Sequence, residues 1–154
     1  MASSYERGPA LGEVDRTLPG ARPLLERLSA LPLSMGLVTG NVGAVAWGRV
    51  RQAGLRHHFL SGAFGDEAMR RSTLVRRAIA RCVQVGGYHV NPEQVIVVGD
   101  TPRDIHAARL TGARCLAVAT GEYSVQTLSQ YRPDWVVRDL TRTDDIVEIL
   151  TTRQ

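Results

Sequence analysis

The segment from residue 95 to residue 112 constrains the fold of this chain more than any other. Val95-Ile96-Val97-Val98 is a continuous, β-branched apolar run that Gly99-Asp100 ends at once. Pro102 then suits the first turn of a helix, which is predicted over Arg103 to Thr111 with Gly112 at its C-cap. A strand that is apolar on both faces and leads directly into a helix is typical of a parallel sheet covered by helices.

The same alternation extends along the rest of the chain. Helices are predicted over residues 22–30, 42–53, 72–83, 125–130 and 144–150, and strands over residues 35–39, 59–64, 115–119 and 135–137. This order favours an α/β fold, a Rossmann-like parallel sheet with helices on both faces. The chain has 154 residues, which suits one domain over residues 18–154. Residues 1–17 are predicted to form a flexible polar leader.

The basic residues are unusual in kind, because all 19 are arginine. They give a net charge of +4, and several recur at spacings that suit an exposed helix face: Arg70, Arg71, Arg76, Arg77 and Arg81. No helix-turn-helix, aromatic RNA-binding or zinc pattern accompanies them, so no nucleic-acid partner is expected. No apolar run approaches the roughly 20 residues of a membrane span, and no signal-peptide pattern is present. We therefore expect a cytoplasmic protein without a membrane partner.

Several residues that often carry chemistry have simpler interpretations here. Cys82 and Cys115 lie in apolar contexts without metal-binding spacing and are predicted to be buried, reduced thiols. The pair His57-His58 follows a helix end, which predicts a surface turn. The pair Asp66-Glu67 lies in a loop at the ligand-binding edge of the sheet, where it could line a site.

Polar residues follow two of the predicted strands, at the edge where an open parallel sheet gathers its ligands. Thr39 ends the first of these strands, and Gly40 and Asn41 form the turn after it. The Thr39 hydroxyl and the following two amides can donate several hydrogen bonds to phosphate oxygens. Alone this signal is weak, because strand–Thr–Gly turns are commonly only structural.

Asp100 and Asp104 form the second polar group. Asp100 ends the strand of residues 95–98, and Asp104 lies in the first turn of the next helix, so both carboxylates can face one crevice. Such oxygen ligands suit Mg²⁺, which binds one or two carboxylates together with waters and a substrate phosphate. The alternative is that both carboxylates cap the helix and interact with its dipole. The pair directly after a β-branched run favours the metal.

Three segments carry a family resemblance when they are read in order. They are Leu-Val-Thr-Gly-Asn at 37–41, Gly-Ala-Phe-Gly-Asp-Glu at 62–67, and Val-Val-Gly-Asp-Thr-Pro-Arg-Asp-Ile-His-Ala-Ala-Arg at 97–109. Together they resemble the haloacid dehalogenase superfamily, and within it the phosphoglycolate-phosphatase-like hydrolases. The resemblance runs from about residue 18 to residue 150 and implies a Mg²⁺-dependent phosphatase of a small phosphorylated metabolite. In that family an aspartate attacks phosphorus, and water hydrolyses the phospho-aspartyl enzyme.

The resemblance implies roles for the matching residues of this chain. Thr39 would hydrogen-bond the phosphoryl group, and the amides of Gly40 and Asn41 would help. Asp100 would hold Mg²⁺, and Asp104 would support it.

The family also uses a basic residue, usually a lysine followed by proline, to neutralise the phosphate. This chain has no lysine, so an arginine must take that role. Arg70 and Arg71 are nearest in the sequence, and we assign Arg71. Arginine can bind phosphate in a fork of two hydrogen bonds.

The family's first motif, an apolar strand ending in Asp-x-Asp-Gly-Thr, has no clear counterpart here. Its nearest echo is Glu13-Val14-Asp15-Arg16-Thr17-Leu18, which no apolar run precedes. In the family this strand lies between the Thr39 strand and the Asp100 strand, and a helical cap follows it. We therefore expect a core that lacks its central first strand and its cap, as in a truncated chain, and that is inactive alone.

The missing strand leaves alternatives open. The two halves of the sheet either close up and pair directly or receive a strand from elsewhere. Open strand edges also favour a rival function, a non-catalytic interaction protein that self-associates through its sheet edge. A third hypothesis is a capless enzyme that uses Asp15 or Glu13 as its nucleophile.

Overall fold

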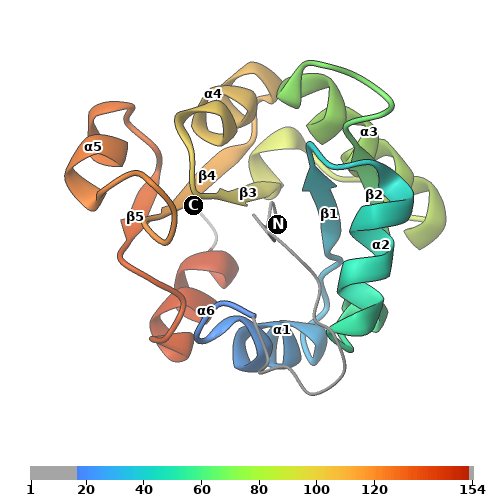
Figure 1. Cartoon of the computed structure of the whole chain (residues 1–154), viewed down its shortest axis with the longest axis horizontal. Coiled ribbons are helices and arrows are strands. Elements are labelled where there is room, and N and C mark those ends of the chain that lie inside the picture. Colours follow the sequence, from blue (N-terminus) through green and yellow to red (C-terminus); the bar gives the residue numbers. More distant parts are fainter. Residues whose placement is uncertain (1–16, 153–154) are drawn as a thin grey trace.

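The computed structural model describes residues 17–152, which alternate between helices and short strands (Figure 1). The helices are α1 (Ala21–Ser29), α2 (Gly43–Gln52), α3 (Arg71–Gly86), α4 (Pro102–Thr111), α5 (Val125–Gln130) and α6 (Thr143–Thr151). The strands are β1 (Gly36–Thr39), β2 (Ser61–Phe64), β3 (Ile96–Gly99), β4 (Arg114–Val118) and β5 (Trp135–Val137). Short 3-10 helices precede β2 and β3, at Arg56–His58 and Pro92–Gln94. No helix within residues 17–152 has the length and apolar character that a membrane crossing needs.

The predicted α/β fold is confirmed, with every predicted helix and strand present. The predicted leader lies outside the described residues except for Thr17. α3 runs to Gly86, past its predicted end at Val83, because Gly87 is its C-cap at a φ of 69°. Gly112 closes α4 in the same left-handed conformation, as the sequence predicts.

The strands of residues 17–152 form two separate parallel sheets. β1 pairs with β2, and Val38 lies opposite Ala63. β3 pairs with β4, with Val98 opposite Leu116, and β5 adds to the far side of β4. Within the described residues no ladder joins β1 to β3, so the two halves do not close up and pair directly.

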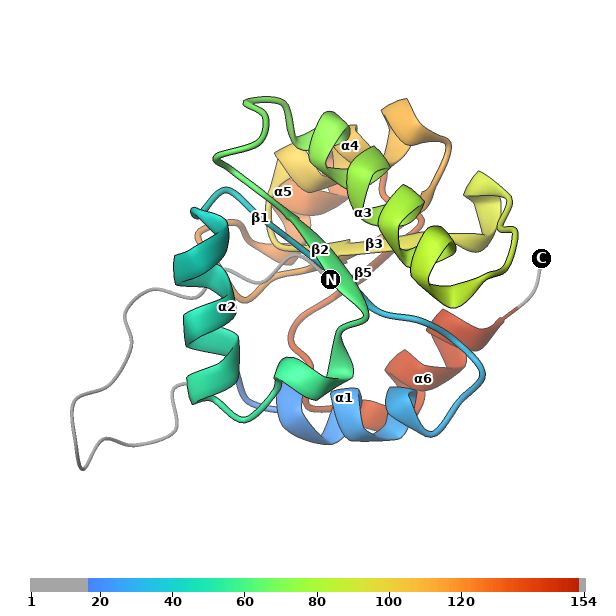
Figure 2. The same cartoon turned by 90° about the vertical axis from the view of Figure 1, so that its right-hand side faces the viewer.

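Successive residues of the strands pack on opposite faces, as a sheet covered on both faces requires. Val38 of β1 and Val97 of β3 share one buried cluster with side chains of α3 and α4. On the other face Val98 packs with α1 and α6, and Leu37 packs with α1 and α2. Figure 2 shows α3 and α4 on one side of the strands and α1 and α6 on the other. Helix packing, not strand pairing, therefore joins the two sheets.

His58 corrects one prediction, because it is buried and does not lie in a surface turn. The 3-10 helix Arg56–His58 places its ring beside α1, with Nδ1 2.6 Å from the hydroxyl oxygen of Ser29. Burial lowers the pKa of His58 and so favours the neutral ring. His57 is exposed.

Cys82 and Cys115 are free and buried, as predicted. Burial raises the pKa of both thiols, and that of Cys115 to about 12. A thiol with so high a pKa is a poor nucleophile, which leaves both cysteines as small core residues.

Candidate functional site

The first candidate group is the turn that follows β1. Thr39 is the last residue of β1 and is buried. Its hydroxyl oxygen accepts a hydrogen bond from the Asn41 amide at 3.2 Å, so the hydroxyl hydrogen remains available to a phosphate oxygen. The same bond engages the Asn41 amide that the sequence assigns to phosphate. Gly40 is exposed, and a Cβ placed on it would have no atom within 4 Å. The turn is therefore ordered by Thr39 and open at Gly40.

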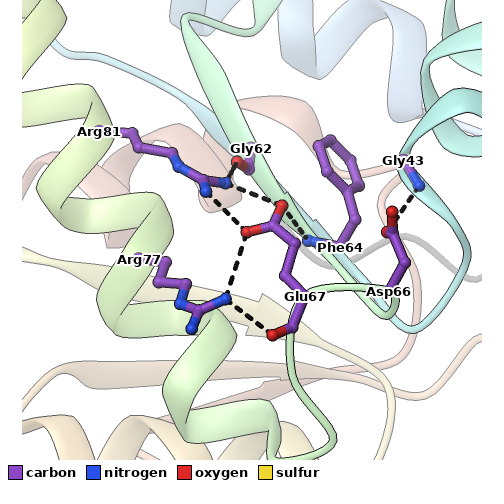
Figure 3. Close-up of polar contacts among 7 residues, drawn as sticks. All are labelled: Gly43, Gly62, Phe64, Asp66, Glu67, Arg77 and Arg81. Atoms are coloured by element: carbon purple, nitrogen blue, oxygen red, sulfur yellow. Dashed lines mark hydrogen bonds and ion pairs between the residues drawn. The ribbon is translucent and has the colours of Figure 1, made fainter.

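The loop after β2 lies against this turn. The Gly65 amide donates a hydrogen bond to the Asn41 carbonyl at 2.9 Å, and a Cβ on Gly65 would overlap the Gly40 carbonyl oxygen. Asp66 accepts a hydrogen bond from the amide of Gly43, the first residue of α2, at 3.0 Å (Figure 3). An acidic side chain suits the unpaired N–H groups at a helix N-terminus. The loop and the turn therefore hold each other in place.

Glu67 is directed the other way, toward α3 (Figure 3). Its carboxylate accepts two hydrogen bonds from the Arg81 guanidinium, at 2.7 and 2.9 Å, and one from the Phe64 amide at 3.3 Å. Arg77 donates to the Glu67 carbonyl oxygen at 2.8 Å. Chiefly the hydrogen bonds from Arg81 lower the pKa of Glu67. Both carboxylate oxygens are thus engaged by neighbouring elements, so Glu67 joins β2 to α3.

Asp100 follows directly on β3 and is partly buried. Its Oδ2 lies so close to Gly121 that a Cβ there would be 2.5 Å away. Gly121 belongs to the loop after β4, the strand that pairs with β3. The ends of two neighbouring strands therefore meet at this carboxylate, at the edge of the sheet that the sequence indicates.

Asp104 lies in the first turn of α4 and forms a capping box with Thr101. Its Oδ2 accepts hydrogen bonds from the Thr101 amide at 3.2 Å and from the Thr101 hydroxyl at 3.0 Å. The residue is 1% exposed and packs against Gly99, where a side chain would overlap it. Burial raises the pKa of Asp104, and Arg71 opposes that rise. The capping interpretation therefore holds for Asp104, and its Oδ1 remains for another partner.

That partner is Arg71, the arginine assigned to phosphate. Its Nε lies 3.5 Å from Oδ1 of Asp104, and the two side chains are 18% and 2% exposed. Within the described residues neither atom has a hydrogen-bond partner, although both are buried. α3 follows β2 and α4 follows β3, so this ion pair joins the two separate sheets. Arg70 is exposed, which distinguishes the two candidate arginines.

The donor set for a cation at this edge is small. Asp100 contributes one carboxylate, and within residues 17–152 no group of three His, Cys, Asp or Glu side chains could hold a metal ion. Mg²⁺ needs only one or two carboxylates when waters and a substrate phosphate complete its octahedron. The chemistry of Asp100 therefore fits an ion that protein and substrate hold jointly.

The structure divides the predicted site between the two sheets. The Thr39 turn belongs to the β1–β2 sheet, and Asp100 belongs to the β3–β4–β5 sheet. The Arg71–Asp104 ion pair connects the two halves. The candidate nucleophiles Glu13 and Asp15 lie outside the described residues.

The bridge from Glu67 to Arg77 and Arg81 is not predicted by the sequence reasoning. Those arginines have the spacing of an exposed helix face, and the structure has Arg81 partly buried against β2. Arg77 and Arg81 are four residues apart and so share one face of α3, with Glu67 shortly before the helix. This spacing is the feature of the sequence that indicates a shared contact of Arg77 and Arg81 with Glu67.

Known proteins resemble this chain in sequence. Residues 69–143, which include Arg71, Asp100 and Asp104, match the family described as HAD-hyrolase-like. A phosphoglycolate phosphatase of Chromobacterium violaceum is 33% identical over 110 residues, covering 71% of this chain and 48% of that protein. A phosphoglycolate phosphatase of Synechococcus elongatus is 30% identical over 133 residues, covering 86% and 58%. The chain thus spans about half the length of these curated relatives.

Solved structures share the fold. One described as a predicted phosphoglycolate phosphatase, from Haemophilus somnus, matches with a TM-score of 0.72 and 24% identity over 87% of this chain and 57% of that one. A haloacid dehalogenase-like hydrolase from Streptococcus pneumoniae matches with a TM-score of 0.71 and 25% identity over 84% and 59%. Sequence and fold agree, and the chain belongs to the haloacid dehalogenase superfamily, among its phosphoglycolate-phosphatase-like hydrolases.

Proposed function

We propose that residues 17–152 form the phosphate- and Mg²⁺-binding part of a phosphomonoester hydrolase that acts on a small phosphorylated metabolite. The contact of Arg71 with Asp104, next to Asp100, carries the proposal. It gathers one cation and two carboxylates at the carboxyl ends of parallel strands, where phosphate sites form. Similarity to two phosphoglycolate phosphatases supports it and makes phosphoglycolate the first substrate to test.

The phosphate would be held by groups from both sheets. The Thr39 hydroxyl donates to a phosphoryl oxygen, and the open space at Gly40 lets that oxygen approach the backbone closely. Arg71 neutralises part of the phosphate's charge, while Asp104 keeps the guanidinium in place. The Asn41 amide already donates a hydrogen bond to the Thr39 hydroxyl oxygen, so we give it a minor part in binding phosphate.

Asp100 would hold Mg²⁺ directly, and Asp104 would support the site through Thr101 and Arg71. The bound ion would neutralise charge on the phosphoryl oxygens during transfer. Burial of both Asp104 oxygens is the reason for giving it the supporting role.

The attacking carboxylate needs a separate source. Of the carboxylates placed near the site, those of Asp104, Glu67 and Asp66 already accept hydrogen bonds, and Asp100 is assigned to the ion. We therefore assign the nucleophile to a strand between β1 and β3. Residues 17–152 then bind phosphate without turning substrate over. Glu13 and Asp15 are the residues of this chain that could supply the carboxylate instead.

The test measures hydrolysis of p-nitrophenyl phosphate and phosphoglycolate with Mg²⁺, in this chain and in one lengthened upstream by its genomic reading frame. Only the lengthened chain is expected to turn over, and Asp100→Asn is expected to abolish its activity. Asp144→Asn is the matched control, because the Asp144 side chain is exposed and its ion pair with Arg27 lies on α1 and α6, away from the candidate site residues. Undiminished turnover in the Asp100→Asn variant would refute the proposal. Activity of the unextended chain that Glu13→Ala with Asp15→Ala abolishes would move the nucleophile to those residues.

Because β1 and β3 do not pair with each other, a second function is favoured: a protein that binds a partner by adding a strand to its sheet edge. Each of these strands has one neighbouring strand within the described residues. Parallel edges of this kind accept an added strand readily. Light scattering over a hundredfold concentration range tests this: self-association supports it, and a monomer throughout counts against it.

A further inference from the structure

We propose that Asp66 and Glu67 are positioning residues that fix the Thr39–Asn41 turn relative to α3, and so relative to Arg71. The inference rests on the proposed function, because it concerns two groups that would bind one phosphate. The two groups come from different elements, since Thr39 ends β1 and Arg71 begins α3. The loop of residues 65–67 contacts both elements.

On the side of the turn, the loop makes two hydrogen bonds, one as donor and one as acceptor. Gly65 donates to the Asn41 carbonyl, and Asp66 accepts from the Gly43 amide. The missing side chain of Gly65 lets the loop touch the Gly40 carbonyl. These contacts hold Asn41 at the end of the turn and Gly43 at the start of α2, on either side of Val42, so the turn is expected to move with the loop.

On the side of the helix, Glu67 makes contacts at two levels of α3. Arg81 binds the carboxylate with both terminal nitrogens, and Arg77 binds the Glu67 carbonyl one helical turn earlier. Arg81 also donates to the Gly62 carbonyl of β2 at 2.7 Å. Two attachments along one helix restrain both its rotation and its shift along the axis. Arg71 at the start of the helix is restrained with them.

The bridge acts through geometry more than through strength. The side chains of Arg81 and Glu67 are 41% and 21% exposed, and exposed ion pairs contribute little to stability. A forked guanidinium–carboxylate pair nevertheless fixes orientation, because it makes parallel hydrogen bonds. Breaking it is therefore expected to misplace the phosphate-binding groups while the fold remains intact.

The experiment uses Glu67→Gln, which keeps the size of the side chain and an acceptor for the Phe64 amide but removes the charge. Arg81→Met removes the other partner, and Asp144→Asn, which breaks an exposed ion pair between α1 and α6, is the matched control. Affinity for inorganic phosphate is measured by calorimetry with Mg²⁺ present, and amide hydrogen exchange is measured without ligand.

Each bridge variant is expected to bind phosphate about tenfold more weakly, and the double variant no more weakly than Arg81→Met alone, because Glu67→Gln acts through its contact with Arg81. Amides of Gly43 and Gly65 exchange faster in Glu67→Gln, while that of Val98 in β3 does not. Additive losses of affinity, or unchanged exchange at Gly43 and Gly65, would overturn the positioning role. If the unaltered chain binds no phosphate, the proposed function fails instead, and the exchange rates alone decide whether Glu67 couples the turn to α3.

Discussion

Replacing Asp104 by alanine is the sharpest test of the ion pair that joins the two sheets. The change removes hydrogen bonds from the Thr101 amide and hydroxyl, at 3.2 and 3.0 Å, and the counter-ion of Arg71 at 3.5 Å. Loss of the capping contact costs about 1 kcal/mol. Removing one partner of a fully buried ion pair costs roughly 3–5 kcal/mol, of which we take about 2 here because the pair is not at contact distance and Arg71 is partly exposed. The expected loss of unfolding free energy is therefore about 3 kcal/mol.

Asp104→Asn separates the two contributions. Its amide oxygen still accepts the hydrogen bonds from Thr101, so the capping box survives in part. The variant also avoids burying a charge in a position where burial raises the pKa of the carboxyl. We expect a loss of about 1–2 kcal/mol, because the loss of about 2 kcal/mol from the missing counter-ion of Arg71 remains and is offset in part by the avoided burial of a charge.

Urea unfolding at pH 7, followed by far-ultraviolet circular dichroism, measures both losses. A loss of about 3 kcal/mol lowers the melting temperature by about 6–12 °C in a chain of this size. Arg71→Met completes a double-mutant cycle, and the double variant is expected to lose less than the sum of the single losses, because Arg71 and Asp104 no longer leave each other unpaired. Equal losses for alanine and asparagine, or a strictly additive cycle, would refute the argument.

The further predictions concern pH and packing. Because the pKa of Glu67 is lowered, its stabilisation is present above the unfolded pKa of 4.5 and is lost as pH falls through the folded value; the urea midpoints of the unaltered chain and Glu67→Gln therefore converge on acidification. Burial raises the pKa of Asp104 from 3.8, so the unaltered chain loses stability as pH rises from 3.8 through the pKa of the folded state. Over that range the urea midpoint of Asp104→Asn is therefore expected to rise relative to that of the unaltered chain. Midpoints that move in the opposite sense would contradict the pKa direction given for Glu67 or for Asp104. Gly65→Ala is expected to lower the urea midpoint, because its Cβ would overlap the Gly40 carbonyl. Gly48→Ala in α2 meets no atom within 4 Å and is expected to raise the free energy of unfolding by up to about 1 kcal/mol. An unchanged midpoint for Gly65→Ala would mean that the loop can move away from the turn.

Much of the fold is predictable because its signals are local. The β-branched run before Gly99, Pro102 at the start of α4 and Gly112 at its end act within a few residues of one another. The same locality gives Asp100 its place at the end of β3. Local rules also leave Asp104 with two interpretations, and the structure shows the capping box without excluding a supporting role at the site.

The remaining features depend on contacts between distant segments. His58 is buried and contacts Ser29 of α1, which is 29 residues away, so its neighbours in the sequence do not indicate this environment. The choice between Arg70 and Arg71 depends on how α3 is turned toward α4, which is set by tertiary packing. Arg81 lies at a position whose spacing predicts an exposed helix face, yet it donates hydrogen bonds to Glu67 and to the Gly62 carbonyl and is partly buried. Spacing shows which side chains share a helix face, but not what that face meets.

The separation of the two sheets bears on how the candidate site keeps its shape. In a continuous sheet, ladder hydrogen bonds set the distance between neighbouring strand ends. Within the described residues no ladder connects β1 to β3, so that distance depends on α3 and α4, which pack against each other and over both sheets. Arg71 and Asp104 lie in the first turns of these two helices, on the side where the strands end. The pair that would orient a phosphate is therefore also one of two polar contacts recorded between α3 and α4 in the described residues, beside the hydrogen bond from Arg76 to the Leu110 carbonyl at 2.8 Å, and a change to it is expected to alter stability and phosphate binding together.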